Sequence, residues 1–173
     1  MIQPKRDPPV MKFRLLLALA ALYPASMTAV AQTDTATFDV TATVDPTCTV
    51  DADNLVFGTY DPFSDTPLDE NSEIRVQCTS DTPYDIGLDD GDNTGAEGER
   101  RMALADESDF LEYDLYHDNH GGTSWGDIDS GAELTGLSGT GSEQSYVVYG
   151  RIFAEQSVAV GNYVDTIEVT VKW

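Results

Sequence analysis

An alternating stretch near the start of the chain limits what the chain can fold into. Residues 35–45 read Thr-Ala-Thr-Phe-Asp-Val-Thr-Ala-Thr-Val-Asp, with an apolar residue at every second position and Thr or Asp between. A period of two predicts a β-strand with one buried face. This strand has two interpretations. It completes the chain's own sheet, or it is offered to another molecule.

The residues before this strand have the pattern of an export signal. Two basic residues follow Met11, and the apolar run 15–23 is shorter than the ~20 residues that span a bilayer. Ala29-Val30-Ala31 matches a small-residue cleavage site. We therefore expect a removable leader at residues 1–31, starting in practice at Met11, and no membrane span. An internal amphipathic helix is the alternative, and the lack of polar residues in the run disfavours it.

The charge balance excludes several classes of partner. The chain has 9 basic and 31 acidic residues and a formal net charge of −22, and the leader holds four of the basic and one of the acidic residues. The mature chain therefore keeps 5 and 30, a net charge of −25. Such a surface repels nucleic acid and anionic lipid. Solubility in high salt explains this charge, and divalent-cation binding is the alternative; the even spread of the acids favours the first.

Two cysteines, Cys48 and Cys78, follow the alternating stretch. An even count in an exported chain predicts a disulfide. A ring of roughly 30 residues would contribute about 3–4 kcal/mol of stability in the chain-entropy model. Two free buried thiols are the alternative. No second Cys or His lies at ligand spacing from either, so we expect no metal there.

Helical periodicity is nearly absent, and short strands are predicted along the whole mature chain. Polar and glycine-rich loops are expected at 61–71, 89–100 and 118–140. One segment, Tyr146–Phe153, is apolar on both faces and should be a central strand. The pattern predicts an all-β, immunoglobulin-like β-sandwich. Its expected strands are Cys48–Val50 continuing after a kink into Leu55–Gly58, then Glu73–Cys78, Tyr84–Leu88, Met102–Leu104, Phe110–His117, Tyr146–Phe153 and Tyr163–Trp173.

The search for catalytic or metal-binding chemistry finds only weak candidates. Ser138 misses the G-x-S-x-G elbow by one position. His117 and His120 are the only histidines, and their spacing suits a helix where a strand running into a loop is expected. The segment from Asp90 copies the start of a calcium loop, but its twelfth position is Arg101 where a glutamate is required. We predict no catalytic residue, no cofactor and no metal site.

A set of motifs gives the chain a family resemblance. The chain resembles the spore coat protein U family, which includes the pilin subunits of archaic chaperone–usher pili, over essentially all of residues 32–173. Its acid-rich loops depart from the family pattern. The matching pieces are Cys48-Thr-Val, Phe57-Gly-Thr-Tyr-Asp-Pro62, Val76-Gln-Cys78-Thr, Pro83-Tyr-Asp-Ile-Gly-Leu88, Arg100-Arg-Met102, Tyr113-Asp-Leu-Tyr-His-Asp118, Trp125-Gly-Asp127, Val148-Tyr-Gly-Arg-Ile152 and Gly161-Asn-Tyr-Val-Asp165.

The resemblance implies a pilin-type sandwich that lacks its last strand and takes one from a neighbour. A periplasmic chaperone would fill the open groove first, and a neighbouring subunit would replace it at an outer-membrane usher. The product would be a fimbrial fibre at the cell surface for adhesion and biofilm. The donor residues would be Phe38, Val40, Ala42 and Val44. The acceptor groove and chaperone-binding edge would include Val50, Ile167, Val169, Val171 and Trp173.

These expectations divide the chain into a leader at 1–31, a donor strand at 32–46 and a sandwich at 47–173. Other functions stay open from the sequence. They are a secreted, self-complete coat or matrix protein, a calcium- or glycan-binding module, and, with least support, a secreted hydrolase. An ordinary first strand within its own sheet is the corresponding alternative for residues 38–44.

Overall fold

The computed structural model describes residues 30–173, so the predicted leader lies outside the described residues except for its last two. The chain divides into two units between Thr41 and Ala42, and each is described by itself. Residues 30–41 are exposed and contain no helix or strand. Within residues 30–173 no helix has the length and apolar character that a membrane span requires.

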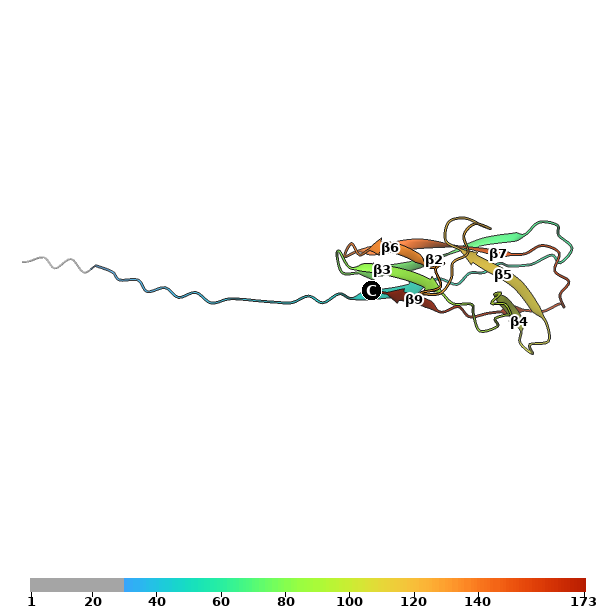
Figure 1. Ribbon diagram of the computed structural model, residues 1–173, viewed down its shortest axis with the longest axis horizontal. Helices are drawn as coiled ribbons and strands as arrows, with labels where there is room; N and C mark the ends of the chain where they lie inside the picture. The colour runs from blue at the N-terminus through green and yellow to red at the C-terminus, as the bar shows by residue number, and fades with distance from the viewer. Residues whose placement is uncertain (1–29) are drawn as a thin grey trace, which may run out of the picture. The chain divides into compact units, whose positions relative to one another are not determined.

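The second unit is built from strands alone. They pair antiparallel in two sheets, one of six strands in the order β1-β2-β7-β5-β4-β8 and one of three in the order β6-β3-β9 (Figure 1). The strands of the described range are β1 Cys48–Ala52, β2 Leu68–Cys78, β3 Pro83–Leu88, β4 Arg101–Leu104, β5 Phe110–Tyr116, β6 Leu134–Ser138, β7 Glu143–Ile152, β8 Tyr163–Val164 and β9 Val169–Lys172.

The β2–β7 pair forms the centre of the larger sheet. Its register runs from Leu68 opposite Ile152 to Gln77 opposite Glu143. On its other side β7 pairs with β5, so the segment predicted to be central is central. The all-β sandwich prediction is confirmed.

The core follows the alternation that the sequence predicts. In β2, Ile74, Val76 and Cys78 are at most 2% exposed, while the residues between them face outward. Trp125 arrives from the loop after β5; it is fully buried, and its indole nitrogen donates to the Ile86 carbonyl oxygen at 2.9 Å. This contact fixes the part of the predicted 118–140 loop around Trp125 to β3 of the smaller sheet.

Several predicted element bounds are wrong. The Leu55–Gly58 segment is not a strand, and β2 begins five residues before Glu73 because its polar first half pairs with β7. Strand β6 was missed because its Gly- and Ser-containing sequence reads as loop. The predicted last strand is two short strands, since the loop after β3 takes the hydrogen bonds of residues 165–168.

Candidate functional site

An apolar groove of about 1160 Å³ opens onto the core of the sandwich. It lies between two segments, 52–60 and 158–169. The first continues from β1 at one end of the larger sheet, and the second leads from β8, at the other end of that sheet, into β9 of the smaller sheet. Its floor consists of core side chains that are buried in the fold and still line the groove: Ile74, Leu88, Leu111, Tyr113, Leu115, Val148 and Ile152. An element that would cover this part of the core is therefore missing from the sandwich.

The first wall continues from β1, the terminal strand of the larger sheet. After Ala52 only Asp53 still bonds to β2: its amide donates to the Glu73 carbonyl at 2.9 Å, and its carbonyl accepts from Ser72 Oγ at 2.6 Å. From residue 54 to residue 59 no backbone group bonds to another part of the described chain. This wall therefore presents free backbone donors and acceptors.

Side chains of the first wall also reach into the groove. Leu55 and Phe57 pack against the core, whereas Val56 between them is 72% exposed. Both inward side chains lie over Gly150 of β7, where a β-carbon would collide with Leu55 and come 2.9 Å from Phe57 Cζ. The absence of a β-carbon at Gly150 therefore leaves the space that the Leu55 and Phe57 side chains occupy beside the groove.

The second wall runs from β8 through residues 165–168 into β9. β9 pairs with β3, and the loop after β3 extends that support. In this loop, the amides of Asp89 and Asp92 donate to the carbonyls of Glu168 and Thr166, each at 3.2 Å, and the Glu168 amide donates back to Asp89 Oδ1 at 2.9 Å. One side of the wall is thus held by backbone contacts, and β9 ends its sheet on the other side.

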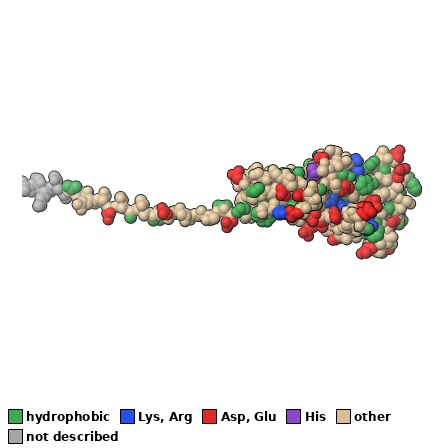
Figure 2. Space-filling model, viewed as in Figure 1, with side chains coloured by type: hydrophobic (Ala, Val, Ile, Leu, Met, Phe, Trp, Pro, Cys, Tyr) green, Lys and Arg blue, Asp and Glu red, His purple; other side chains and the backbone are tan. Residues whose placement is uncertain are grey.

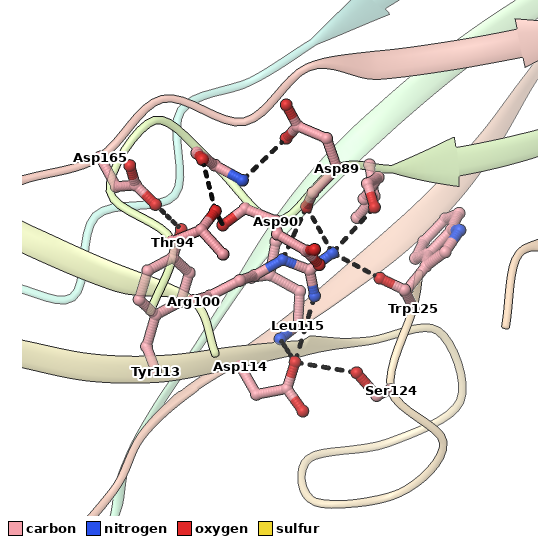
Figure 3. A network of polar contacts seen from close by, with 12 residues as sticks. Asp89, Asp90, Thr94, Arg100, Tyr113, Asp114, Leu115, Ser124, Trp125 and Asp165 are labelled. Carbon is pink, nitrogen blue, oxygen red and sulfur yellow. Dashed lines mark hydrogen bonds and ion pairs between the residues drawn. The ribbon is translucent and has the colours of Figure 1, made fainter. Parts of the chain in front are cut away.

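A buried arginine fixes the loop that supports this wall (Figure 3). Arg100 is 4% exposed, and its guanidinium donates to the carbonyl oxygens of Leu88 at 2.9 Å, Asp89 at 2.6 Å and Trp125 at 2.7 Å. It also pairs with the Asp114 carboxylate at 3.1 Å. These bonds join the end of β3, the Trp125 loop and β5 at one point, so Arg100 positions the loop behind the second wall.

A tyrosine in the groove floor makes a second polar anchor. Tyr113 donates its hydroxyl to Asp165 Oδ2 at 2.6 Å, and Asp165 also accepts from the amide and side chain of Asn93 (Figure 3 shows the tyrosine and aspartate). Burial and then the Asp165 carboxylate raise the pKa of Tyr113 well above its ordinary value. The phenol therefore stays protonated and holds Asp165 in the wall.

The predicted disulfide is present and lies at the first residue of β1. Cys48 and Cys78 are bonded and directly opposite each other in the β1–β2 register. The preceding residue, Thr47, bonds to Thr79, the residue after Cys78: the Thr79 amide donates to the Thr47 carbonyl at 3.0 Å, and the Thr47 amide donates to Thr79 Oγ1 at 3.3 Å. The chain is thus tied to β2 just where residues 30–47 end.

The predicted acceptor residues fall in two groups. Ile167 and Val169 line the groove, whereas Val50, Val171 and Trp173 do not. Val50 and Trp173 are 42% and 58% exposed, and Val171 packs against the core. The physical reason is that β1 and β9 approach each other at this end, with Cα atoms within 8 Å, so the groove is open only further along both walls.

The predicted donor residues are exposed. Phe38 and Val40 are each 85% exposed and Val44 is 82% exposed, and Ala42 is exposed as well. Residues 30–47 form no strand in the isolated chain. The alternating apolar side chains of this segment are therefore exposed to solvent in the single chain.

The weak chemical candidates have structural contacts of their own. His117 packs edge-on against Trp125 and His120 against Tyr149, with ring centroids 6.0 and 5.2 Å apart. Ser138 is exposed on β6. The segment from Asp90 turns on itself through Thr94 Oγ1 and supports the second wall. Across residues 30–173 no group of three or more His, Cys, Asp or Glu side chains is arranged to hold a metal ion.

Sequence reasoning missed several groove residues. Val158 and Tyr113 line it, and Val158 lies between the expected strands Tyr146–Phe153 and Tyr163–Trp173, where no element was predicted. The apolar run Val158-Ala159-Val160 was the available signal. Arg100 was missed as a positioning residue because nothing in a loop of acids and glycines indicates that its arginine is buried.

This arrangement defines a class of protein. A two-sheet antiparallel sandwich, open between the terminal strands of its two sheets and down to its core, is an incomplete immunoglobulin-like domain of the pilin type. The Spore Coat Protein U domain model matches residues 34–170. The chain therefore belongs to the spore coat protein U family, as the motifs predicted.

Two similar proteins accompany the family match. Protein U of Myxococcus xanthus is 35% identical over 129 residues, which cover 69% of this chain and 71% of that protein. A chain of the CsuC–CsuE chaperone–tip adhesion subunit pre-assembly complex, from the archaic chaperone–usher Csu pili of Acinetobacter baumannii, superposes with a TM-score of 0.55 at 27% identity. That match covers 76% of this chain and 40% of the solved chain.

Proposed function

We propose that the chain is a structural subunit of a surface fibre of the chaperone–usher type. Residues 35–45 of one copy would fill the groove of the next as a donor strand. The observation that carries the proposal is the groove itself: an apolar channel over core side chains, bordered by strand-like segments that end their sheets.

The donor segment suits this groove chemically. Its apolar side chains would point to the floor while Thr and Asp point outward, and its backbone would pair with the free edge of the first wall. At about 25 cal/mol per Å² of apolar surface, four such side chains contribute several kcal/mol. A slip of one residue would turn Thr and Asp into the core, so register is fixed by the alternation.

The geometry of exchange favours an open filament. One surface gives a strand and a different surface receives it, which is a heterologous contact that does not close on itself. The exposed groove is also an aggregation hazard before assembly. This hazard supports a periplasmic chaperone as first occupant. The resemblance to pilins of archaic chaperone–usher pili adds an outer-membrane usher as assembly site and a surface fimbrium for adhesion and biofilm as the product.

The proposal is tested with three forms of the mature chain, residues 32–173. We expect the parent to form polymers, a form lacking residues 32–45 to form none, and a form with a copy of residues 35–45 linked after Trp173 to be monomeric. Size-exclusion chromatography with light scattering distinguishes them. A monomeric parent, or a truncated form that polymerises equally, contradicts the proposal.

A further inference from the structure

The groove and the strand proposed to fill it carry charge of one sign only. Among the groove-lining residues the ionisable carboxylates are Asp53 and Asp165, and none is basic. Residues 30–47 contain Asp34, Asp39 and Asp45 and again no basic residue. The polar face of the donor strand and the rim of its acceptor therefore repel each other.

Positive charge near the groove is already committed to other contacts. Arg75 is shared between Asp53 at 2.8 Å, Asp51 at 2.6 Å and Glu73 at 3.5 Å, so this cluster keeps a net negative charge. Asp165 is held by neutral donors. In Figure 2 acidic side chains are spread over the visible face and basic ones are few.

The remaining basic residues of the described chain are also engaged. Arg100 pairs with Asp114, Arg151 with Asp69 and Lys172 with Asp129. Arg101 donates to the carbonyls of Asn93 and Thr94 and lies 4.3 Å from the centre of the Phe110 ring.

Resting on the proposed function, we propose that joining of two copies is gated by ionic strength through the charges of the donor strand and the groove rim. Repulsion between exposed charges reaches about 10 Å at 0.1 M salt and about 3 Å at 1 M. Like charges on approaching surfaces slow association. The subunit therefore assembles slowly at low ionic strength and rapidly at high ionic strength.

The test compares initial polymerisation rates of full mature chains by light scattering, between about 0.05 M and about 1 M NaCl. We expect the parent rate to rise by roughly tenfold or more. A variant with Asp34→Asn, Asp39→Asn and Asp45→Asn should assemble faster at low salt and respond less to salt. A variant with Asp39→Lys and Asp45→Lys should reverse the response and assemble faster at low salt.

The reversal separates electrostatics from the general strengthening of apolar contacts by salt. A matched control, Asp65→Asn, Glu97→Gln and Glu143→Gln, removes the same charge from residues that do not line the groove. It should keep the parent's salt response.

Equal salt responses in the parent and all variants, or a control that matches the donor variant, overturn the proposal. Absence of polymer at every salt concentration contradicts the proposed function instead.

Discussion

At the scale of single residues, Arg100 is the side chain on which the groove wall most depends. Its guanidinium is 4% exposed and satisfies carbonyl oxygens of three segments as well as Asp114. Among the described side chains, no buried nitrogen or oxygen lacks a hydrogen-bond partner. Removing the guanidinium would take a buried donor from three carbonyl oxygens and break the ion pair with Asp114, whose Oδ1 would keep its bonds from the Leu115 amide and the Ser124 hydroxyl.

We expect Arg100→Met to lower the free energy of unfolding by about 3–5 kcal/mol, because three carbonyl oxygens lose a buried donor and Asp114 loses its ion pair. Urea unfolding of the form with a copy of residues 35–45 linked after Trp173 measures this change in free energy. Arg75→Met is the matched control: its ion pairs are exposed, so its effect should be much smaller. Equal losses of unfolding free energy in the two variants would show that the burial of Arg100 does not determine its contribution to stability.

A second residue-scale prediction concerns pH. Arg151 donates to both carboxylate oxygens of Asp69 at 2.7 Å, and this bonding holds the pKa of Asp69 below its ordinary 3.8. Because the folded pKa is the lower one, the contact stabilises the fold above pH 3.8, and that stability is lost as the pH falls through the folded pKa.

Asp69→Asn should therefore destabilise the chain at pH 7 and lose its deficit at low pH. Unfolding curves of parent and variant from pH 7 to about pH 2 test this. Taking the difference between the two chains cancels the general relief of self-repulsion as the other acids are protonated. A deficit that stays constant with pH would contradict the assignment.

At the scale of elements, the alternation of residues 35–45 would carry the specificity of the proposed strand exchange. Neighbouring residues face opposite sides of a strand, so Val40 and Thr41 form a matched pair. Val40→Asp would place a charge over the core, whereas Thr41→Asp would place it in solvent.

We expect Val40→Asp to abolish polymerisation, and Thr41→Asp to preserve it at about 1 M NaCl, where added charge is screened. Light scattering on the mature chain measures polymer formation by both variants. Polymerisation by both variants alike would show that the apolar face of this segment does not enter the groove.

Much of the element scale could be predicted from sequence. The alternation in Ile74-Arg-Val76 and in Tyr84–Leu88 reports burial on one face, and both segments are strands with that face in the core. The failures have a common cause. Residues 55–58 have the composition of a strand but lack a partner strand, and residues 165–168 continue an alternating segment but bond to a loop. Hydrogen bonding to a neighbouring strand, and not the sequence pattern alone, therefore decides whether these segments are strands. The groove's extent depends on the same long-range pairing.

At the scale of the whole molecule, the proposed filling of the groove would be coupled to folding. A ligand that binds only the folded state stabilises it by RT ln(1 + [L]/Kd), which is about 2.7 kcal/mol at a hundredfold excess over Kd. On this proposal, the form with an empty groove is the less stable one.

A peptide of residues 32–47 should accordingly raise the unfolding midpoint of a chain lacking residues 32–45, by an amount that grows with the logarithm of peptide concentration. Thermal unfolding followed by tryptophan fluorescence measures it, since Trp125 is fully buried. A peptide with the same composition in scrambled order is the control, and an equal rise with it would refute the coupling.

The position of the Cys48–Cys78 bond has a mechanical consequence for a fibre. Tension along connected subunits would enter each sandwich at Cys48, the first residue of a five-residue strand that could otherwise peel away. The covalent link passes that pull to β2, which pairs along ten residues with β7. Stretched fibres should then yield first between subunits when oxidised, and within them after reduction, a difference that single-molecule force measurements would resolve.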